Sequence, residues 1–225
     1  MLYCHKYCFF RGTEMKDYRY VIWDFNGTLL DDVSTGITAL NVLLSRRGLP
    51  PVKTEREYRD VFRFPIIDYY KDVGFDFTRE RFDDVANEWV KAYLDAENPV
   101  ACRGVKPVLK FFRSRDVEQV IISASEKEML LRQLDLIDLS GYFSEICGRD
   151  DIYASSKKEM ATKWAHRAPP GQKLFIGDTT HDYEVARAID ADVILLCNGH
   201  QSRKRLEKCN CPVLDGAWQI LDTIR

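Results

Sequence analysis

The stretch YVIWDFNGTL, residues 20–29, joins a short apolar run to a polar turn. Residues 20–23 predict a buried strand, and Asp24 follows directly at its carboxyl end, where open α/β sheets bind their ligands. Gly27 allows the backbone to turn sharply, and the hydroxyl of Thr28 can tie that turn down. A carboxylate in this place is a candidate nucleophile, able to form an acyl-phosphate. The stretch therefore indicates an α/β fold with a chemical site at one end of its sheet.

Composition narrows the class of protein. The chain has 225 residues, is 45% hydrophobic and 30% charged, and carries a net charge of −2. It is long enough for one sizeable core with a small accessory domain, and its charge predicts no nucleic-acid partner and no membrane partner. No apolar run approaches the ~20 residues that span a bilayer. Seven scattered cysteines favour free thiols, so we expect a cytoplasmic protein without a zinc site.

Apolar strands alternate with amphipathic helices along most of the chain. This alternation predicts a doubly wound parallel sheet, a Rossmann-like α/β architecture. The expected strands are residues 20–24, 117–123, 143–147, 173–177 and 192–196. One expected helix begins at residues 31–34. The other expected helices cover residues 105–115, 126–136, 157–166, 182–189 and 216–224.

Residues 54–101 interrupt this alternation. Three helices are expected there, over residues 54–63, 66–73 and 78–96, with no strand between them. We therefore expect an α/β core domain of residues 15–31 and 103–225, and a small all-helical cap domain of residues 32–102 inserted after the first strand. Many aromatic residues in the insert favour a helical core over an aromatic substrate pocket. Residues 1–14 fit neither unit and are read as an extension of no assigned role.

A second apolar strand is also followed by carboxylates. Residues 175–182, FIGDTTHD, place Asp178 and Asp182 four residues apart on the loop and helix start after an apolar strand. One of these carboxylates facing Asp24 would make a cluster of hard oxygen ligands that suits Mg²⁺. The alternative is that Asp178 or a neighbouring threonine only caps the following helix.

Four short motifs occur in an order that resembles the haloacid dehalogenase-like (HAD) hydrolase superfamily. They are Asp24 to Leu29, the strand-ending Ser123, the lysine at the start of the helix at residue 157, and Gly177-Asp178 with Asp182. The position of the helical insert and the tail from Asn198 to Asp215 resemble the phosphoglycolate phosphatase-like branch. The resemblance covers the chain from about Tyr18 to its end.

The resemblance implies a role for each of these positions. Asp24 would be the nucleophile, and Mg²⁺ would be held by Asp24, the main-chain oxygen of Asn26 and Asp178. Asp182 and Thr28 would support this arrangement. The phosphoryl group would be bound by Ser123, the backbone N–H of Ala124, and Lys157. Lys157 is preferred over Lys158, which we expect to face solvent.

Asn26 departs from the family pattern, which has a second aspartate at this position. In the family that aspartate protonates the leaving alcohol and then deprotonates the attacking water, and an amide can do neither. Such acid–base catalysis typically contributes about 10²–10⁴-fold. We therefore expect a slow enzyme, or one that acts on good leaving groups such as acyl phosphates. His181 and Asp31 are the nearest possible substitutes in the sequence.

Three functions fit these observations. The preferred one is a magnesium-dependent phosphatase of small phosphorylated metabolites that works through an aspartyl-phosphate, as a monomer or homodimer. The alternative is a catalytically weak phosphoryl-binding or regulatory protein, and the third is a carbon–halogen hydrolase. Substrate choice would lie in the cap, where Arg63, Phe64 and Tyr69 are candidates no better supported than their neighbours.

Overall fold

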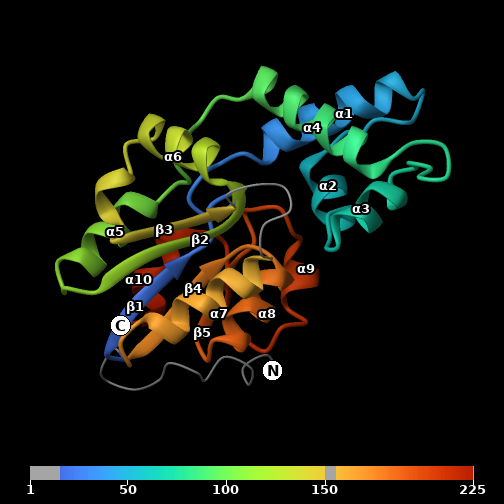
Figure 1. The fold of residues 1–225 in the computed structure, drawn as a ribbon. Helices are drawn as coiled ribbons and strands as arrows, with labels where there is room; N and C mark the ends of the chain where they lie inside the picture. Colours follow the sequence, from blue (N-terminus) through green and yellow to red (C-terminus); the bar gives the residue numbers. More distant parts are fainter. Residues whose placement is uncertain (1–15, 150–155, 225) are drawn as a thin grey trace, which may run out of the picture.

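The computed structural model describes residues 16–149 and 156–224, which build one parallel sheet of six strands (Figure 1). The strands are β1 (Tyr18–Trp23), β2 (Glu118–Glu126), β3 (Glu145–Arg149), β4 (Gln172–Gly177), β5 (Asp192–Leu196) and β6 (Val213–Leu214). Their order is β3-β2-β1-β4-β5-β6. The chain thus winds outward from β1 to β3 and then returns to continue on the other side with β4. The switch point lies between β1 and β4, where sheets of this kind place their ligands.

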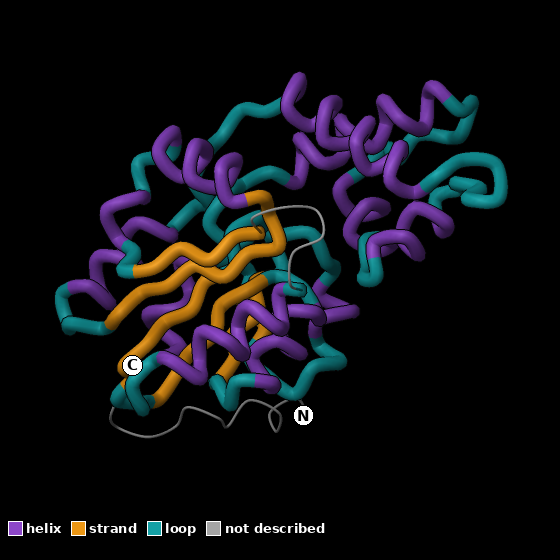
Figure 2. The backbone as a smooth tube through the Cα atoms, viewed as in Figure 1, coloured by secondary structure: helices purple, strands orange, loops and turns teal. Residues whose placement is uncertain are grey.

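Helices cover both faces of the sheet, as Figure 2 shows. The helices α5 (Val105–Arg113), α6 (Lys127–Leu136) and α10 (Ile220–Ile224) share one hydrophobic cluster with the sheet. The helices α7 (Lys157–Arg167), α8 (Thr180–Ala188) and α9 (Arg203–Leu206) share a second cluster on the opposite face. Side chains of β1 alternate between them: Trp23 packs on Phe112 of α5, and Tyr20 on Trp164 of α7. The doubly wound α/β architecture predicted from the sequence is confirmed.

A layer of four helices lies beyond the carboxyl ends of the strands (Figure 1). It consists of α1 (Val33–Arg46), α2 (Glu55–Val61), α3 (Ile66–Asp72) and α4 (Phe82–Ala96), and we call it the helical layer. It has its own hydrophobic cluster, in which most of its aromatic side chains are buried or packed. The preference for a helical core over an aromatic pocket is therefore confirmed. The exact domain boundaries stay a prediction.

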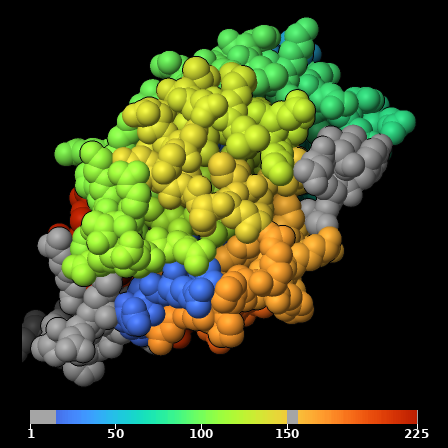
Figure 3. Space-filling model, turned by 60° about the vertical axis from the view of Figure 1, so that its left-hand side comes forward, coloured from blue at the N-terminus to red at the C-terminus, as the bar shows by residue number. Residues whose placement is uncertain are grey.

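The helical layer contacts the α/β part at several points. The connections on either side of the layer run side by side, since Asp31 N donates to Val100 O and Cys102 N to Leu29 O. Glu97, at the end of α4, pairs with Arg132 of α6, and the green and yellow atoms of these helices meet at the top of Figure 3.

A further contact joins α2 to the loop after β5. Arg59 donates from Nε to Gly199 O at 2.7 Å and from Nη2 to Asn198 O at 2.8 Å, and Ser202 N donates to Arg59 O. The end of α2 is therefore fixed to the loop of residues 198–202.

Several element boundaries differ from the prediction. Strand β2 runs three residues beyond Ser123, because Glu126 still pairs with Arg149 of β3. Helix α4 begins at Phe82 rather than residue 78, and residues 217–219 form a 3₁₀ turn before α10. The short strand β6 was not predicted, since two residues show no periodicity. The expectation for residues 1–14 falls outside the described residues. Within the described residues, no helix has the length and apolar character needed to cross a membrane.

Candidate active site

The sequence motifs meet at the carboxyl ends of β1, β2 and β4. Trp23 is in register with Ile121 of β2 and with Ile176 of β4, so Asp24 leaves β1 between the two neighbouring strands. Its N–H donates to the carbonyl oxygen of Ile176 at 2.9 Å, which continues the sheet pairing to this residue. Asp24 is buried, at 7% exposure. The backbone of the sheet therefore fixes where its carboxylate lies.

Three buried carboxylates gather at this point. Asp24, Asp178 and Asp182 each place one oxygen within 4.8 Å of the others. Lys157, the first residue of α7, donates from Nζ to Asp24 Oδ1 and, at 2.5 Å, to Asp182 Oδ1. Its side chain is 4% exposed, whereas Lys158 faces solvent. The structure thus brings together Asp24, Lys157, Asp178 and Asp182 as the sequence predicted, and it separates Lys158 from them.

Asp182 is held by the start of its own helix. Thr179 is the N-cap of α8 and forms a capping box with Asp182, the third residue of the helix. The Thr179 side chain accepts from Asp182 N, and the Asp182 side chain accepts from Thr179 N. Its Oδ2 accepts hydrogen bonds from Thr179 N at 2.9 Å, Thr179 Oγ1 at 2.7 Å and Asp178 N at 3.1 Å. Burial alone would raise the pKa of Asp182, but Lys157 and these donors lower it. Of the two caps considered in the alternative, the threonine is the one observed: Thr179 caps the helix, while the Asp178 carboxylate accepts from Thr28 and His200.

Asp178 lies deeper and has only neutral donors. Thr28 Oγ1 donates to its Oδ1 at 3.2 Å, and the backbone N–H of His200 donates to its Oδ2 at 2.6 Å. Burial raises the pKa of Asp178 well above its ordinary value, and the nearby carboxylates add to this. Burial likewise raises the pKa of Asp24 to about 6, although Lys157 opposes the shift. Both carboxylates would be better accommodated beside a further positive charge.

The donor set fits a divalent cation. Asp24, Asp178 and Asp182 are hard oxygen ligands, and Lys157 supplies one positive charge against the three. Lys157 and the donors of Thr179 lower the pKa of Asp182, whereas the pKa of Asp24 and that of Asp178 are raised by burial. The geometry therefore favours Asp24 and Asp178 as the side chains that face a metal, with Asp182 as their support.

Gly27 makes the close approach of the turn to Asp178 feasible. It has φ +71°, and a Cβ at this residue would lie 2.5 Å from Asp178 Oδ2 and 2.6 Å from His200 Cδ2. Gly27→Ala is therefore expected to cost about 2–4 kcal/mol of unfolding free energy and to displace the Asp178 carboxylate. Urea unfolding measures this, with Gly48→Ala as the matched control. Gly48 has φ +65° and nothing within 4 Å of its Cβ position, so equal losses in both variants would refute the crowding.

The end of β2 lies beside Asn26. Ser123 is buried and its Oγ accepts a hydrogen bond from Ser125 N at 3.1 Å, while Ala124 is exposed. Ser125, for which no role was predicted, donates from its Oγ to Asn26 Oδ1 at 2.5 Å. Two of the predicted phosphate-binding residues, Ser123 and Ala124, thus lie near the end of β2 beside Asn26.

Two residues that sequence reasoning missed lie beside Asn26. Asp32 accepts from Asn26 Nδ2 at 2.7 Å, and His200 Nε2 lies 3.1 Å from the other Asp32 oxygen. Burial disfavours charge on both, but their mutual attraction raises the pKa of His200 to about 9 and lowers that of Asp32. Asp32 had been assigned only to a helix start. The proposed substitutes are elsewhere: Asp31 is exposed, and His181 stacks on Phe64.

The three cap residues named from the sequence have different surroundings. Phe64 packs against His181, with ring centroids 5.0 Å apart, and so approaches the start of α8. Tyr69 is buried in the helical layer, and Arg63 pairs with Asp72. Of the three, Phe64 is the one that touches the α/β part.

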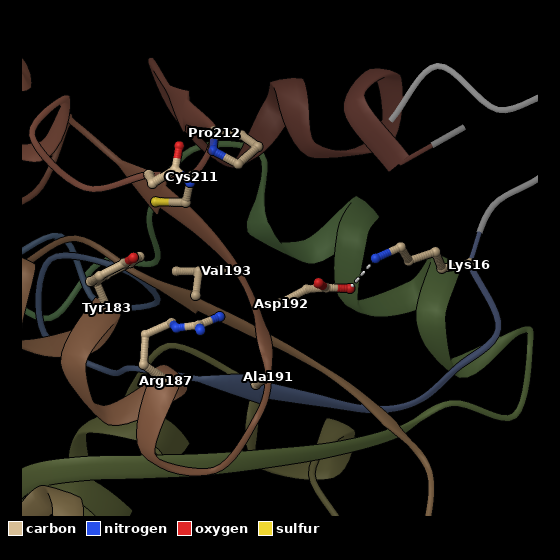
Figure 4. A pocket seen from close by; sticks show the side chains of 9 residues that line it. Lys16, Tyr183, Arg187, Ala191, Asp192, Val193, Cys211 and Pro212 are labelled. Atoms are coloured by element: carbon tan, nitrogen blue, oxygen red, sulfur yellow. Dashed lines mark hydrogen bonds and ion pairs between the residues drawn. The ribbon is translucent and has the colours of Figure 1, made fainter. Parts of the chain in front are cut away.

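A cavity of about 180 Å³ lies elsewhere, at the amino end of β5 (Figure 4). It is bordered by Asp192, which pairs with Lys16 at 2.8 Å, and by Arg187 and Cys211. Because Asp192 begins β5, this cavity is at the opposite end of the sheet from the carboxylates.

Comparisons with known proteins agree with this geometry. The model of a family described as haloacid dehalogenase-like hydrolase matches residues 21–196. A phosphoglycolate phosphatase of Pseudomonas fluorescens strain Pf-5 is 25% identical over 90% of this chain and 78% of its own length. Another, of Pseudomonas putida strain KT2440, is 24% identical over 84% and 73%. The crystal structure of a predicted phosphoglycolate phosphatase from Haemophilus somnus has a TM-score of 0.71 and 14% identity, covering 92% of this chain and 98% of that one.

Proposed function

The chain belongs to the haloacid dehalogenase-like hydrolases, in the phosphoglycolate phosphatase-like branch, and from this premise we propose that it is a magnesium-dependent phosphatase of small phosphorylated metabolites. The observation that carries the proposal is the buried cluster of Asp24, Asp178 and Asp182 around Lys157 at the switch point of the sheet. The curated relatives are named phosphatases, which supports a phosphorylated substrate.

The metal would be held by Asp24, the main-chain oxygen of Asn26, and Asp178. When bound, Mg²⁺ supplies positive charge that stabilises the negative charge of a transferring phosphoryl group. Asp182 keeps Lys157 and the start of α8 in place through its two oxygens. The fit rests on the surplus of buried carboxylates and on the raised pKa of Asp24 and Asp178.

The chain's own residues would carry the reaction in two steps. Asp24 attacks the phosphorus atom, the bond from phosphorus to the leaving oxygen breaks, and an aspartyl-phosphate forms. Water then attacks this phosphorus, which returns the Asp24 carboxylate and releases phosphate. Ser123, the N–H of Ala124, and Lys157 would stabilise the phosphoryl oxygens in both steps. Three elements, β1, β2 and α7, supply these groups.

Asn26 limits the rate in this scheme, because its amide cannot transfer a proton to the leaving group. We expect slow turnover of alkyl phosphates and faster turnover of acyl phosphates, whose leaving groups need no protonation. The same feature favours a second candidate, a phosphoryl-binding protein with weak or no turnover. Binding of phosphate and Mg²⁺ without hydrolysis would distinguish it.

The test is steady-state hydrolysis of a panel that includes acetyl phosphate and several alkyl phosphates, with Mg²⁺ and with EDTA. Turnover should require the metal and disappear in Asp24→Ala, while the exposed neighbour Lys158→Ala should leave it unchanged. Mg²⁺ should also raise the melting temperature of the native chain, because a ligand that binds only the folded state stabilises it. Asp178→Asn should remove most of that rise. Metal-independent turnover, or turnover that survives Asp24→Ala, would disprove the proposal.

A further inference from the structure

The Asn26 side chain is held from both ends of its amide. Ser125 Oγ donates to Oδ1 at 2.5 Å, and Nδ2 donates to Asp32 Oδ2 at 2.7 Å. An amide oxygen only accepts and an amide nitrogen only donates, so these two partners fix the orientation of the group. The site at residue 26 is thus built for an amide, with a donor on one side and an acceptor on the other.

The surroundings of Asp32 have the opposite character. Its Oδ2 accepts from Asn26 Nδ2 and, at 2.9 Å, from Tyr93 OH of α4. Its Oδ1 accepts from Gly27 N at 2.9 Å and faces His200 Nε2 at 3.1 Å. Asp32 is 4% exposed, so these contacts account for a carboxylate that is removed from water. The site at residue 32 is built for a carboxylate.

Asn26 is also the accessible member of its turn. Residues 21–25 and 27–30 are all buried, whereas Asn26 is partly exposed. Its Nδ2 carries two hydrogens, and the bond to Asp32 uses one of them. Within residues 16–149 and 156–224 the other N–H has no hydrogen-bond acceptor, so it can donate to a group bound beside Asp24, such as the oxygen that leaves phosphorus.

We propose that Asp32 is a positioning residue for Asn26, and that the two form a matched pair with the amide at residue 26 and the carboxylate at residue 32. The expected effect on turnover rests on the proposed phosphatase function, whereas the pairing of residues 26 and 32 does not depend on it. Asp32 holds the Asn26 amide so that one N–H stays available to the leaving oxygen.

The pairing changes what a single substitution at residue 26 can do. Asn26→Asp supplies the carboxyl group found in the family pattern, but it sets this group against the Asp32 carboxylate at hydrogen-bond distance. Two like charges at this distance repel strongly, since the Asp32 carboxylate is removed from water. Exchanging both residues, Asn26→Asp with Asp32→Asn, keeps one amide and one carboxylate. Ser125 can still donate to residue 26, and Gly27 N–H can still donate to the amide oxygen at residue 32.

A double-mutant cycle tests the pair. The native chain, Asn26→Asp, Asp32→Asn and the exchanged double variant are compared by urea unfolding without metal, and by kcat and KM on acetyl phosphate. Each single change should lower kcat at least tenfold with KM changed less than threefold, and should lower the folded-to-unfolded ratio at least tenfold. The exchanged variant should be at least tenfold better in both measurements than the sum of the single changes predicts, but it should stay below the native chain, because Asp32→Asn also removes the carboxylate that Tyr93 and His200 contact.

A matched control uses the neighbouring carboxylate. Asp31 is exposed, so Asn26→Asp combined with Asp31→Asn should keep the full defect of Asn26→Asp alone. Additive effects of residues 26 and 32, or a gain of kcat in Asn26→Asp alone, would overturn the inference. If no variant hydrolyses acetyl phosphate or the metabolite panel, the proposed function fails, and the coupling measured by unfolding still decides the pairing.

Discussion

Asp24→Asn should abolish turnover and at the same time make the folded protein more stable. Loss of a nucleophile is expected to lower kcat by at least about 10⁴-fold. The gain in stability follows from the raised pKa of Asp24, about 6 against an ordinary 3.8, which means that the charged form is disfavoured in the buried cluster. A neutral isostere removes that cost, worth about 1–3 kcal/mol at pH 7.

The gain in stability of Asp24→Asn should depend on pH. Because the folded-state pKa of Asp24 lies above its unfolded value, the native chain loses stability from this group as pH rises from about 4 to 6. Asp24→Asn should flatten that decline, although the raised pKa of Asp178 leaves part of it. Urea unfolding at pH 4.5, 6 and 7.5 measures the slope, and exposed Asp95→Asn should leave it unchanged. A variant that is less stable than the native chain at pH 7.5 would contradict the prediction.

Lys157→Met should have the largest effect on stability. Lys157 touches both Asp24 and Asp182, whose side chains are 10% and 1% exposed. Removing one partner of a buried ion pair typically costs about 3–5 kcal/mol, because the remaining charge is left uncompensated. The variant should also lower kcat by at least about 10²-fold, since the phosphoryl group loses a positive charge.

The stability lost in Lys157→Met should depend on pH, and the same substitution at residue 158 should not cause it. It should be largest near pH 7 and smaller near pH 4, where Asp24 takes up a proton and no longer needs a cation. Thermal and urea unfolding at both pH values measure this, with Lys158→Met as the matched control on the exposed face of the same helix. Equal stability of the two lysine variants at pH 7 would show that the buried ion pairs contribute little.

The sequence was sufficient for the features that depend on short segments. The run from Tyr20 to Trp23 and the residues after it predicted a buried strand with a carboxylate at its end, and the structure has both. Lys157 was preferred over Lys158 by resemblance to the family motif, and in the structure Lys157 is buried while Lys158 is exposed. Local periodicity also predicted the helical layer and the preference for an aromatic core there.

The features that were missed depend on contacts between distant residues. Asp32 and His200 are 168 positions apart, and their pairing appears only when the loop after β5 meets the start of α1. From the sequence, Asp32 looks like any acidic residue before a helix. One available signal was the pair Asp31-Asp32, five and six residues after Asn26, where a carboxylate could have been considered as a partner for the amide.

The contact of α2 with the loop of residues 198–202 restricts how the two parts of the molecule can move. The two connections, at residues 29–32 and 100–102, pair in the antiparallel sense and form a line about which the helical layer could rotate. Besides the Glu97–Arg132 pair, Arg59 attaches the helical layer to the α/β part, by bonds to two main-chain carbonyls just before His200. The helical layer cannot rotate about this line until the hydrogen bonds of Arg59 are broken. Because His200 N donates to Asp178 Oδ2, a rotation that pulls on residues 198 and 199 would also move a hydrogen-bond donor of the carboxylate cluster.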